Sequence, residues 1–494
     1  AFLEEKKYDD AEAEFKRALK VDKKNPEIYA GLGEVYLKQN QLNEAERQFR
    51  RAIELNPSHS AFHLQLAKTL VAGGRVNEGR DAFQTVIDID PTNAQAFYYL
   101  GSLQAKEEET ADKAVANLEM AVKLDPDFYG SHKVLSDLYA EMGDRERALR
   151  EIREAIRLKE DDPAFRLALA DLLFKNNREE DAMEEWLKMT ELFPQNLQAR
   201  MRLGDWYFQK GALQESLEQY KAAKSIAPKN PEVHAQVGRI YMGKKETQRA
   251  IEAFRDAVNL DSGDGEVYAQ LGRMLAAEEK WDEALEALES AIDLKQDSGE
   301  IHFEMGEIFL AKEMPKQAAE EFRKSLKRNP GNILYHRVLA ETLATQKKLD
   351  PAINVLQTAA KLEPKNAEIF FDLCKVYSKK FYYTAAIGHC KKAVELRSDY
   401  YDAMNRLAWL YAKKRMNLDE AAKLSSQTLA KFPQRTQYID TLSEIYYVKG
   451  DVEGAVASIQ TAIQLAPDTP YYKQQLWKFK NIKLKPLDPV KQFP

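Results

Sequence analysis

Residues 26–59 read PEIYAGLGEVYLKQNQLNEAERQFRRAIELNPSH, and the same pattern returns along most of the chain. The first half of this stretch places apolar and small residues from Tyr29 to Tyr36 at intervals of three and four, which is typical of one helix face. The second half repeats this spacing around Phe49. Pro57 ends the second segment because proline cannot continue a helical hydrogen-bond ladder. The stretch therefore predicts two helices joined by a polar turn.

This predicted hairpin recurs with a step of 34 residues, apart from two steps of 35. The step is marked by small residues, which are Ala11, Ala45, Gly79, Ala114, Ala148, Ala182, Ser216, Ala250, Ala284, Ala318, Ala352, Ala386, Ala421 and Ala455. A sustained period in this range is the signature of a solenoid, in which each unit packs only against its neighbours. The predicted fold class is therefore all-α, an α-solenoid.

The order of an aromatic residue, Leu-Gly, Tyr, Ala, Phe or Tyr, Ala and Pro resembles the tetratricopeptide repeat family over about residues 8–469. The resemblance implies a right-handed superhelix of antiparallel helical hairpins, with the first helices lining a concave groove. We expect a partial first repeat, contributed by its second helix, at 1–25 and thirteen repeats at 26–469. A capping helix is expected at 470–481 and an extended tail rich in Pro and Lys at 482–494.

The chain opens in the middle of a repeat, so we expect further sequence upstream, in the form of repeats, a signal peptide or a membrane anchor. The net charge of −6 gives no electrostatic footprint for nucleic acid. No apolar run approaches the roughly 18 residues that span a bilayer. The sequence therefore predicts no nucleic-acid partner and no transmembrane segment in this chain, and leaves the cytoplasm and the periplasm both open.

Five of the seven histidines occupy the packed aromatic position of the first helix; they are His63, His132, His234, His302 and His336. With one histidine per repeat, they do not form the paired spacing of a zinc site. Core packing is therefore the favoured interpretation. No nucleotide-binding, protease or hydrolase motif occurs in the chain. We expect no catalytic residues, no metal site and no cofactor.

Cys374 and Cys390 are expected on facing helices of one repeat, at positions that are small or packed in other repeats. Two buried thiols are the favoured expectation, since free cysteine behaves as a small apolar residue. A disulfide is the alternative if the compartment is oxidising.

Charged residues at one groove position of the first helix alternate in blocks. They run Asp137, Asp171, Asp205, then Arg239, Arg273, then Glu307, Glu341, then Lys375. In one interpretation the Asp block attracts a basic segment of a partner and the Arg pair an acidic one. In the other, the block junctions pair between neighbouring repeats, as Asp205 with Arg239, Arg273 with Glu307, and Glu341 with Lys375. Both interpretations stay open at the level of sequence.

Aromatic residues form the second candidate surface, because aromatic side chains dominate interface hot spots. Those predicted to contact a partner in the groove or on a turn are Phe174, Phe208, Phe371, Phe381, Tyr382, Trp409 and Tyr447. Phe381 and Tyr382 stand in a turn that usually holds glycine and a polar residue, so packing alone does not account for them.

These features predict a non-catalytic scaffold that docks partner peptides, amphipathic helices or folded subunits. By family analogy, long arrays of this kind assemble bacterial membrane or envelope complexes. A chaperone-like receptor for clients is the alternative. The third possibility is the non-catalytic part of an enzyme whose catalytic domain lies upstream. Membrane association would require an anchor ahead of residue 1 or a membrane-bound partner.

Overall fold

The computed structural model describes residues 8–484, which fold into 28 α-helices and one 3₁₀ helix, with no β-strand in that range. The beginning of the predicted partial repeat, residues 1–7, and most of the predicted tail, residues 485–494, lie outside the described residues. The chain forms two compact units, residues 1–244 and residues 245–494. Both are α-solenoids, and each is described by itself.

The N-terminal unit contains α1 (Tyr8–Val21), α2 (Pro26–Lys38), α3 (Leu42–Leu55), α4 (Ser60–Ala72), α5 (Val76–Ile89), α6 (Ala94–Gln104), the 3₁₀ helix η1 (Glu108–Thr110), α7 (Ala111–Leu124), α8 (Tyr129–Glu141), α9 (Arg145–Leu158), α10 (Pro163–Lys175), α11 (Glu179–Leu192), α12 (Leu197–Gln209), α13 (Leu213–Ile226) and α14 (Pro231–Gly243).

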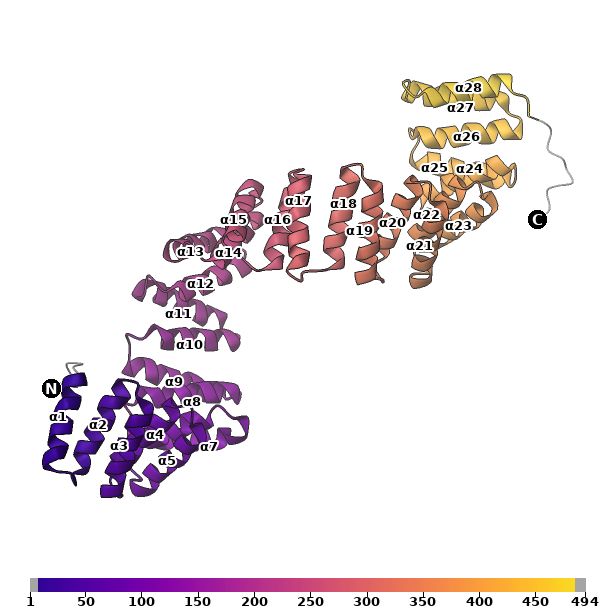
Figure 1. Cartoon of the computed structure of the whole chain (residues 1–494). Helices are drawn as coiled ribbons and strands as arrows, with labels where there is room; N and C mark the ends of the chain where they lie inside the picture. Colours follow the sequence, from indigo (N-terminus) through magenta and orange to yellow (C-terminus); the bar gives the residue numbers. More distant parts are fainter. Residues whose placement is uncertain (1–7, 485–494) are drawn as a thin grey trace. The chain divides into compact units, whose positions relative to one another are not determined.

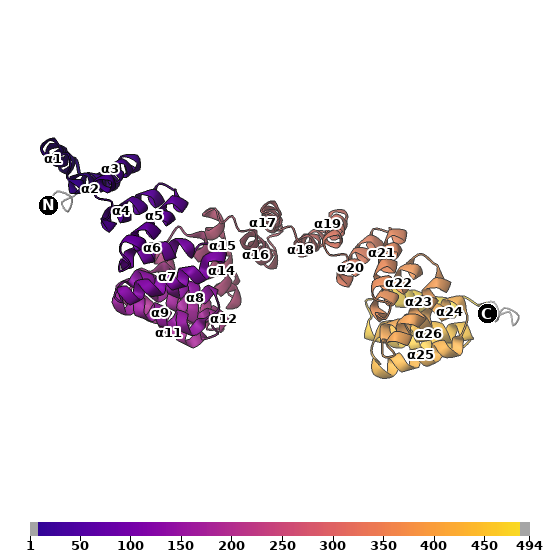
Figure 2. The same cartoon turned by 90° about the horizontal axis from the view of Figure 1, so that it is seen from below.

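The C-terminal unit contains α15 (Thr247–Asn259), α16 (Gly265–Ala277), α17 (Trp281–Asp293), α18 (Gly299–Ala311), α19 (Pro315–Arg328), α20 (Ile333–Thr345), α21 (Leu349–Leu362), α22 (Ala367–Lys379), α23 (Tyr383–Leu396), α24 (Tyr401–Lys414), α25 (Leu418–Lys431), α26 (Thr436–Lys449), α27 (Val452–Leu465) and α28 (Pro470–Asn481). Within each unit, successive helices lie side by side in chain order (Figures 1 and 2).

The α2–α3 hairpin shows how local sequence sets the helix ends. The side chain of Asn25 accepts a hydrogen bond of 3.0 Å from the backbone N–H of Glu27, and so satisfies one of the free donors of the first turn. Pro26 occupies the first helical position, where a missing N–H costs nothing. Asn40, with φ of 60°, reverses the chain between the two helices. Each hairpin is thus bounded by its own capping and turn residues.

The small residues of the repeat allow the two helices of a hairpin to approach closely. A Cβ atom on Gly33 would lie only 2.8 Å from the ring of Phe49, which is fully buried. The same relation holds seven repeats further along the chain, where a Cβ on Gly272 would lie 2.8 Å from Leu288. This packing explains why the step tolerates only small side chains at these positions.

First helices of neighbouring repeats also contact one another, as α16 does with α18, α20 with α22, and α24 with α26 in the C-terminal unit. They form a continuous layer that carries the charged and aromatic groups discussed below. Among the described residues, no helix is long and apolar enough to cross a bilayer.

The histidines at the aromatic position act within the repeat core. The Nε2 atoms of His63, His132, His234 and His336 lie 2.8–3.0 Å from the carbonyl oxygen of the proline six residues earlier. In His302, the same atom lies 3.1 Å from an aspartate oxygen. Each ring thereby ties the start of its helix to the preceding turn.

The expectation of two free thiols is wrong. The structure joins Cys374 on α22 to Cys390 on α23 in a disulfide, with Cα atoms 5.3 Å apart and both residues fully buried. In other hairpins of this unit, the equivalent positions hold the close contacts Gly272–Leu288 and Gly306–Phe322. That close approach brings two cysteines within bonding distance.

Candidate interaction surface

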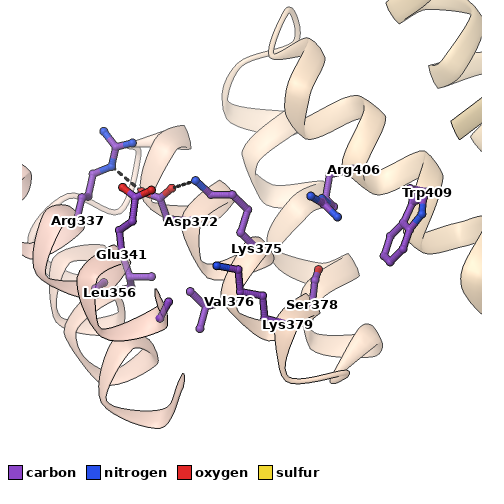
Figure 3. Close-up of a pocket in the computed structure, with 12 residues that line it drawn as sticks. Arg337, Glu341, Leu356, Asp372, Lys375, Val376, Ser378, Lys379, Arg406 and Trp409 are labelled. Carbon is purple, nitrogen blue, oxygen red and sulfur yellow. Dashed lines mark hydrogen bonds and ion pairs between the residues drawn. The ribbon is translucent and has the colours of Figure 1, made fainter. Parts of the chain in front are cut away.

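A pocket of about 310 Å³ opens on the first-helix layer of the C-terminal unit. Its walls come from three successive first helices, α20, α22 and α24, and its floor includes apolar side chains of α20 to α22 (Figure 3). Cationic side chains outnumber acidic ones along its walls. The lining residues are Arg337, Ala340, Glu341, Ala344, Leu356, Asp372, Lys375, Val376, Ser378, Lys379, Arg406 and Trp409.

One side of the pocket is an ion-pair network. The Nε of Arg337 on α20 lies 2.6 Å from a carboxylate oxygen of Asp372 on α22, and Arg337 also pairs with Glu368. The ammonium group of Lys375 lies 2.6 Å from the other oxygen of Asp372 (Figure 3). Asp372 is therefore fully occupied by two cations.

The other side of the pocket is formed by Arg406 and Trp409 on α24. The guanidinium of Arg406 lies 5.3 Å from the centroid of the Trp409 ring, and Lys413 approaches that ring at the same distance. Within residues 8–484, Arg406 forms no salt bridge. Figure 3 shows it projecting toward α22. Burial lowers the pKa of its guanidinium below the ordinary value.

The turn between α22 and α23 carries an aromatic patch, which we define as Phe381, Tyr382, Tyr383 and Trp409. Phe381 and Tyr382 are 74% and 55% exposed. The ring centroids of Phe381 and Tyr383 are 6.2 Å apart, and those of Tyr383 and Trp409 are 6.3 Å apart. The patch thus runs from the turn to the pocket, and Trp409 belongs to both.

The pairing predicted between groove residues 34 apart is wrong at two of its three junctions. The pairs found are Arg273–Glu304 at 2.7 Å and Lys375–Asp372 at 2.6 Å, in place of Arg273–Glu307 and Glu341–Lys375. The first of these joins residues 31 apart. Helical side chains lean toward the N-terminus of their own helix, so the nearest group on the next helix lies a turn earlier than the period suggests.

The acidic block of the N-terminal unit is engaged within the chain. Asp137 accepts from Lys133 at 2.5 Å, and Asp171 pairs with Arg202 at 3.5 Å. Asp205 accepts a hydrogen bond from the Tyr220 hydroxyl. These contacts fit the structural interpretation of the block.

At the third predicted junction, the positive charge of Arg239 attracts the carboxylate of Asp205 and acts to lower its pKa. Burial raises the pKa of Asp205, whereas the Tyr220 hydrogen bond and the charges of Arg202 and Arg239 act in the opposite direction. The net direction is upward, so burial dominates at this carboxyl.

The remaining aromatic candidates are more enclosed. Phe174 packs against Trp186 at 5.5 Å, and Phe208 is half-buried. Phe371 makes an edge contact with Tyr400 at 4.9 Å.

Tyr447 differs from the expectation of a groove contact. It is only 3% exposed and packs against Phe479 of α28, with ring centroids 4.8 Å apart. Its hydroxyl donates to the backbone oxygen of Ile482 at 2.6 Å. The C-terminal helix covers it and removes it from the open surface.

Sequence patterns did not point to Arg337, Lys379 or Arg406. The signal was present, because Lys375 and Arg406 are 31 residues apart, the spacing at which Arg273 meets Glu304. Only the structure shows that residues with this spacing meet between neighbouring first helices.

Models of the tetratricopeptide repeat match several segments of the chain. They are residues 2–52 and 275–342 for one model, 31–94, 64–127, 134–196 and 236–301 for a second, and 204–244 for a third. The comparison with curated proteins gives no match.

Among solved structures, YrrB, a tetratricopeptide repeat protein with an unusual peptide-binding site, is 21% identical and covers 40% of this chain and 97% of its own, with a TM-score of 0.35. The Cut9–Hcn1 hetero-tetramer of the APC/C is 15% identical and covers 97% and 94%, with a TM-score of 0.36. The pilF protein of Pseudomonas aeruginosa is 21% identical and covers 43% and 96%, also with a TM-score of 0.36.

Proposed function

The chain belongs to the tetratricopeptide repeat family, and we propose that it is a non-catalytic scaffold that binds a partner protein through the aromatic patch and the neighbouring pocket. Stacked helical repeats present extended surfaces that suit peptides, helices and folded subunits. The observation that carries the proposal is the exposure of Phe381 and Tyr382.

The backbone at Phe381 makes this exposure informative. Phe381 has φ of 62°, a left-handed conformation that costs an L-residue about 1–2 kcal/mol and favours Gly or Asn. The equivalent turn positions of other repeats hold asparagine as at Asn177, glycine as at Gly211, or a charged residue as at Lys347. A bulky ring at this position neither fits the backbone nor gains much burial in the free chain. A partner that covers the ring would account for it.

The finer proposal is that this scaffold takes part in assembling an envelope or membrane complex. The disulfide between Cys374 and Cys390 supports that setting, because disulfides persist in oxidising compartments such as the bacterial periplasm.

The test is affinity capture with the full chain, followed by measurement of the mass of the isolated complex. A scaffold retains a partner in fixed stoichiometry. A client-holding chaperone would instead retain many weakly bound proteins and suppress their aggregation. Capture of many proteins without fixed stoichiometry would contradict the scaffold proposal and favour the chaperone alternative.

The double variant Phe381→Asn/Tyr382→Lys tests the patch. It restores residues that other repeats carry at these turn positions, as at Asn177 and Lys348. We expect partner affinity to fall by about tenfold or more, because aromatic anchors dominate interface energies. Leu362→Lys is the matched control, since Leu362 is exposed on the second helix α21, away from the patch. Equal capture by the wild type and the double variant would exclude the patch as the contact.

A further inference from the structure

Several ion pairs between neighbouring first helices of the C-terminal unit join residues 31 positions apart. They are Arg273–Glu304, Arg337–Glu368 and Lys413–Glu444. Lys375 and Arg406 have the same spacing, but both are cations. Two like positive charges therefore line the pocket at this step, and one repeat earlier the same spacing places two acids, Glu341 and Asp372, in its lining.

The acidic lining residues neutralise these charges only in part. Asp372 is shared between Arg337 and Lys375. Glu341 forms no salt bridge among the residues that the structure describes, and it is exposed at the rim. Within residues 8–484, Arg406 forms no salt bridge, and its guanidinium has the face of Trp409 as a favourable neighbour. Lys379 adds a third cation, which has no ion-pair partner in residues 8–484.

A partly buried guanidinium without a carboxylate is costly, since the loss of water is not compensated. The three cations, the indole of Trp409 and the apolar floor of Val376 and Ala344 together complement one chemical group. That group is a single carboxylate beside an apolar side chain.

We infer that this pocket binds an acidic side chain, Asp or Glu, of the partner protein, with its carboxylate between Lys375 and Arg406. An apolar neighbour in the same partner segment contacts Trp409 and Val376. The inference rests on the proposed function and specifies the chemistry of the partner at that site.

A phosphate group fits the pocket less well than a carboxylate. Asp372 and Glu341 both line it, and each repels a doubly charged anion more strongly than a singly charged one. The proposed ligand is therefore a carboxylate of a peptide, and phosphate is the competing anion in the test.

The experiment titrates the full chain with fluorescein-labelled peptides and follows fluorescence anisotropy at low salt. The acidic probe is GSLEELSG and its neutral match is GSLQQLSG. We expect the acidic probe to bind more tightly. Arg406→Gln should weaken acidic-probe binding by about tenfold while leaving the neutral probe unchanged, because a charge-assisted hydrogen bond is lost. Arg406→Glu should shift the preference to GSLKKLSG.

Arg323→Gln is the matched control, because Arg323 is an exposed arginine on the second helix α19. Helicity measured by circular dichroism verifies that each variant is folded. Equal binding of the acidic and neutral probes, or equal binding by the wild type and Arg406→Gln, would overturn the inference. Competition by inorganic phosphate at lower concentration than acetate would overturn the choice of a carboxylate.

The outcome for the scaffold is separate. Partner capture that depends on Phe381 and Tyr382 but not on Arg406 would leave the proposed function intact and refute the acidic pocket. If neither the Phe381/Tyr382 variant nor the Arg406 variant loses partner capture, both the proposed contact surface and the acidic pocket are refuted.

Discussion

Two arginines on the first-helix layer of the C-terminal unit have opposite surroundings. Arg273 on α16 meets three carboxylates, with Glu304 at 2.7 Å, Glu266 at 3.4 Å and Glu300 at 3.9 Å. Arg406 on α24 faces Lys375 and the ring of Trp409. Lys375 and Arg406 stand at the repeat positions of Arg273 and Glu304, so the arginine takes the place of the acidic partner.

The comparison separates charges that hold the solenoid together from charges that stay open to a partner. Around α16 and α18 the groove charges are used within the chain. Around α22 and α24, Lys375 and Lys413 are paired, whereas Lys379 and Arg406 form no salt bridge within residues 8–484. The same region carries the exposed aromatic patch. Charge composition by itself does not reveal this, because both regions contain both signs.

The largest expected effect concerns the disulfide, which joins α22 to α23. Cys374 and Cys390 stand where the α16–α17 hairpin holds Gly272 against Leu288. The disulfide closes a loop with a sequence separation of 16 residues, so its loss should lower the free energy of unfolding of that hairpin by about 3 kcal/mol.

Hydrogen exchange of α22 and α23, with and without reductant, measures this effect. The control is α16–α17, whose exchange should not depend on reductant. Intact mass after alkylation under denaturing conditions provides a separate check of the bond, and two alkylated cysteines in the untreated protein would contradict it.

The second prediction sets the two arginines directly against each other. Arg273→Gln should cost about 2 kcal/mol in urea unfolding, because it leaves the half-buried Glu304 without its partner. Arg406→Gln should change stability by less than about 0.5 kcal/mol, since it leaves no carboxylate unpaired. The double variant Arg273→Gln/Glu304→Gln should recover part of the loss. Equal losses of unfolding free energy in the two single variants would contradict the proposed difference between the two arginines.

A smaller effect is expected at the turns that follow α18 and α22. Glu313 and Phe381 have φ of 57° and 62°. Replacing either with glycine should stabilise the chain by about 0.5–1 kcal/mol, because the left-handed strain is relieved while the flexibility of glycine offsets part of the gain. Thermal unfolding measures both variants. A loss of stability specific to Phe381→Gly would mean that the ring packs for stability rather than for a partner.

The smallest effect concerns Glu307 on α18, a carboxyl that forms no salt bridge among the described residues. Burial raises the pKa of Glu307. An acid with a raised folded-state pKa stabilises the chain below its unfolded pKa and loses that contribution as the pH rises through the folded-state value.

Glu307→Gln should therefore stabilise the chain at pH 7.5 by a few tenths of a kcal/mol, reduced by solvent screening, and should have no effect near pH 4. Thermal unfolding at the two pH values tests the sign, and a gain at the lower pH would contradict it.

The fold could be predicted because one residue pattern recurs many times. Ala45 and Gly33 are small for a packing reason that repeats in each hairpin, and the family match and the helices confirm that interpretation. The structural role of the histidines could be predicted from the same repeat pattern. Their ring nitrogens occupy the place that a tyrosine hydroxyl takes beside the preceding turn.

The candidate surface could be predicted only in part. Phe381, Tyr382 and Trp409 stood out because they interrupt the repeat. Arg406 did not, since its significance depends on a contact register set by side-chain lean and helix packing rather than by the period. Tyr447 was misplaced because α28 packs against its ring, with Phe479 at a centroid distance of 4.8 Å.

The bond between Cys374 and Cys390 also determines how this array would carry tension. A pull on the two ends of the chain passes through the sulfur atoms, so residues 375–389 bear none of the load. Because its sequence separation is 16 residues, the closed loop shortens the fully extended chain by roughly 50 Å. Lys375, Lys379 and the exposed rings of Phe381 and Tyr382 all lie inside this shielded segment, which would keep its closed loop while neighbouring repeats are drawn out.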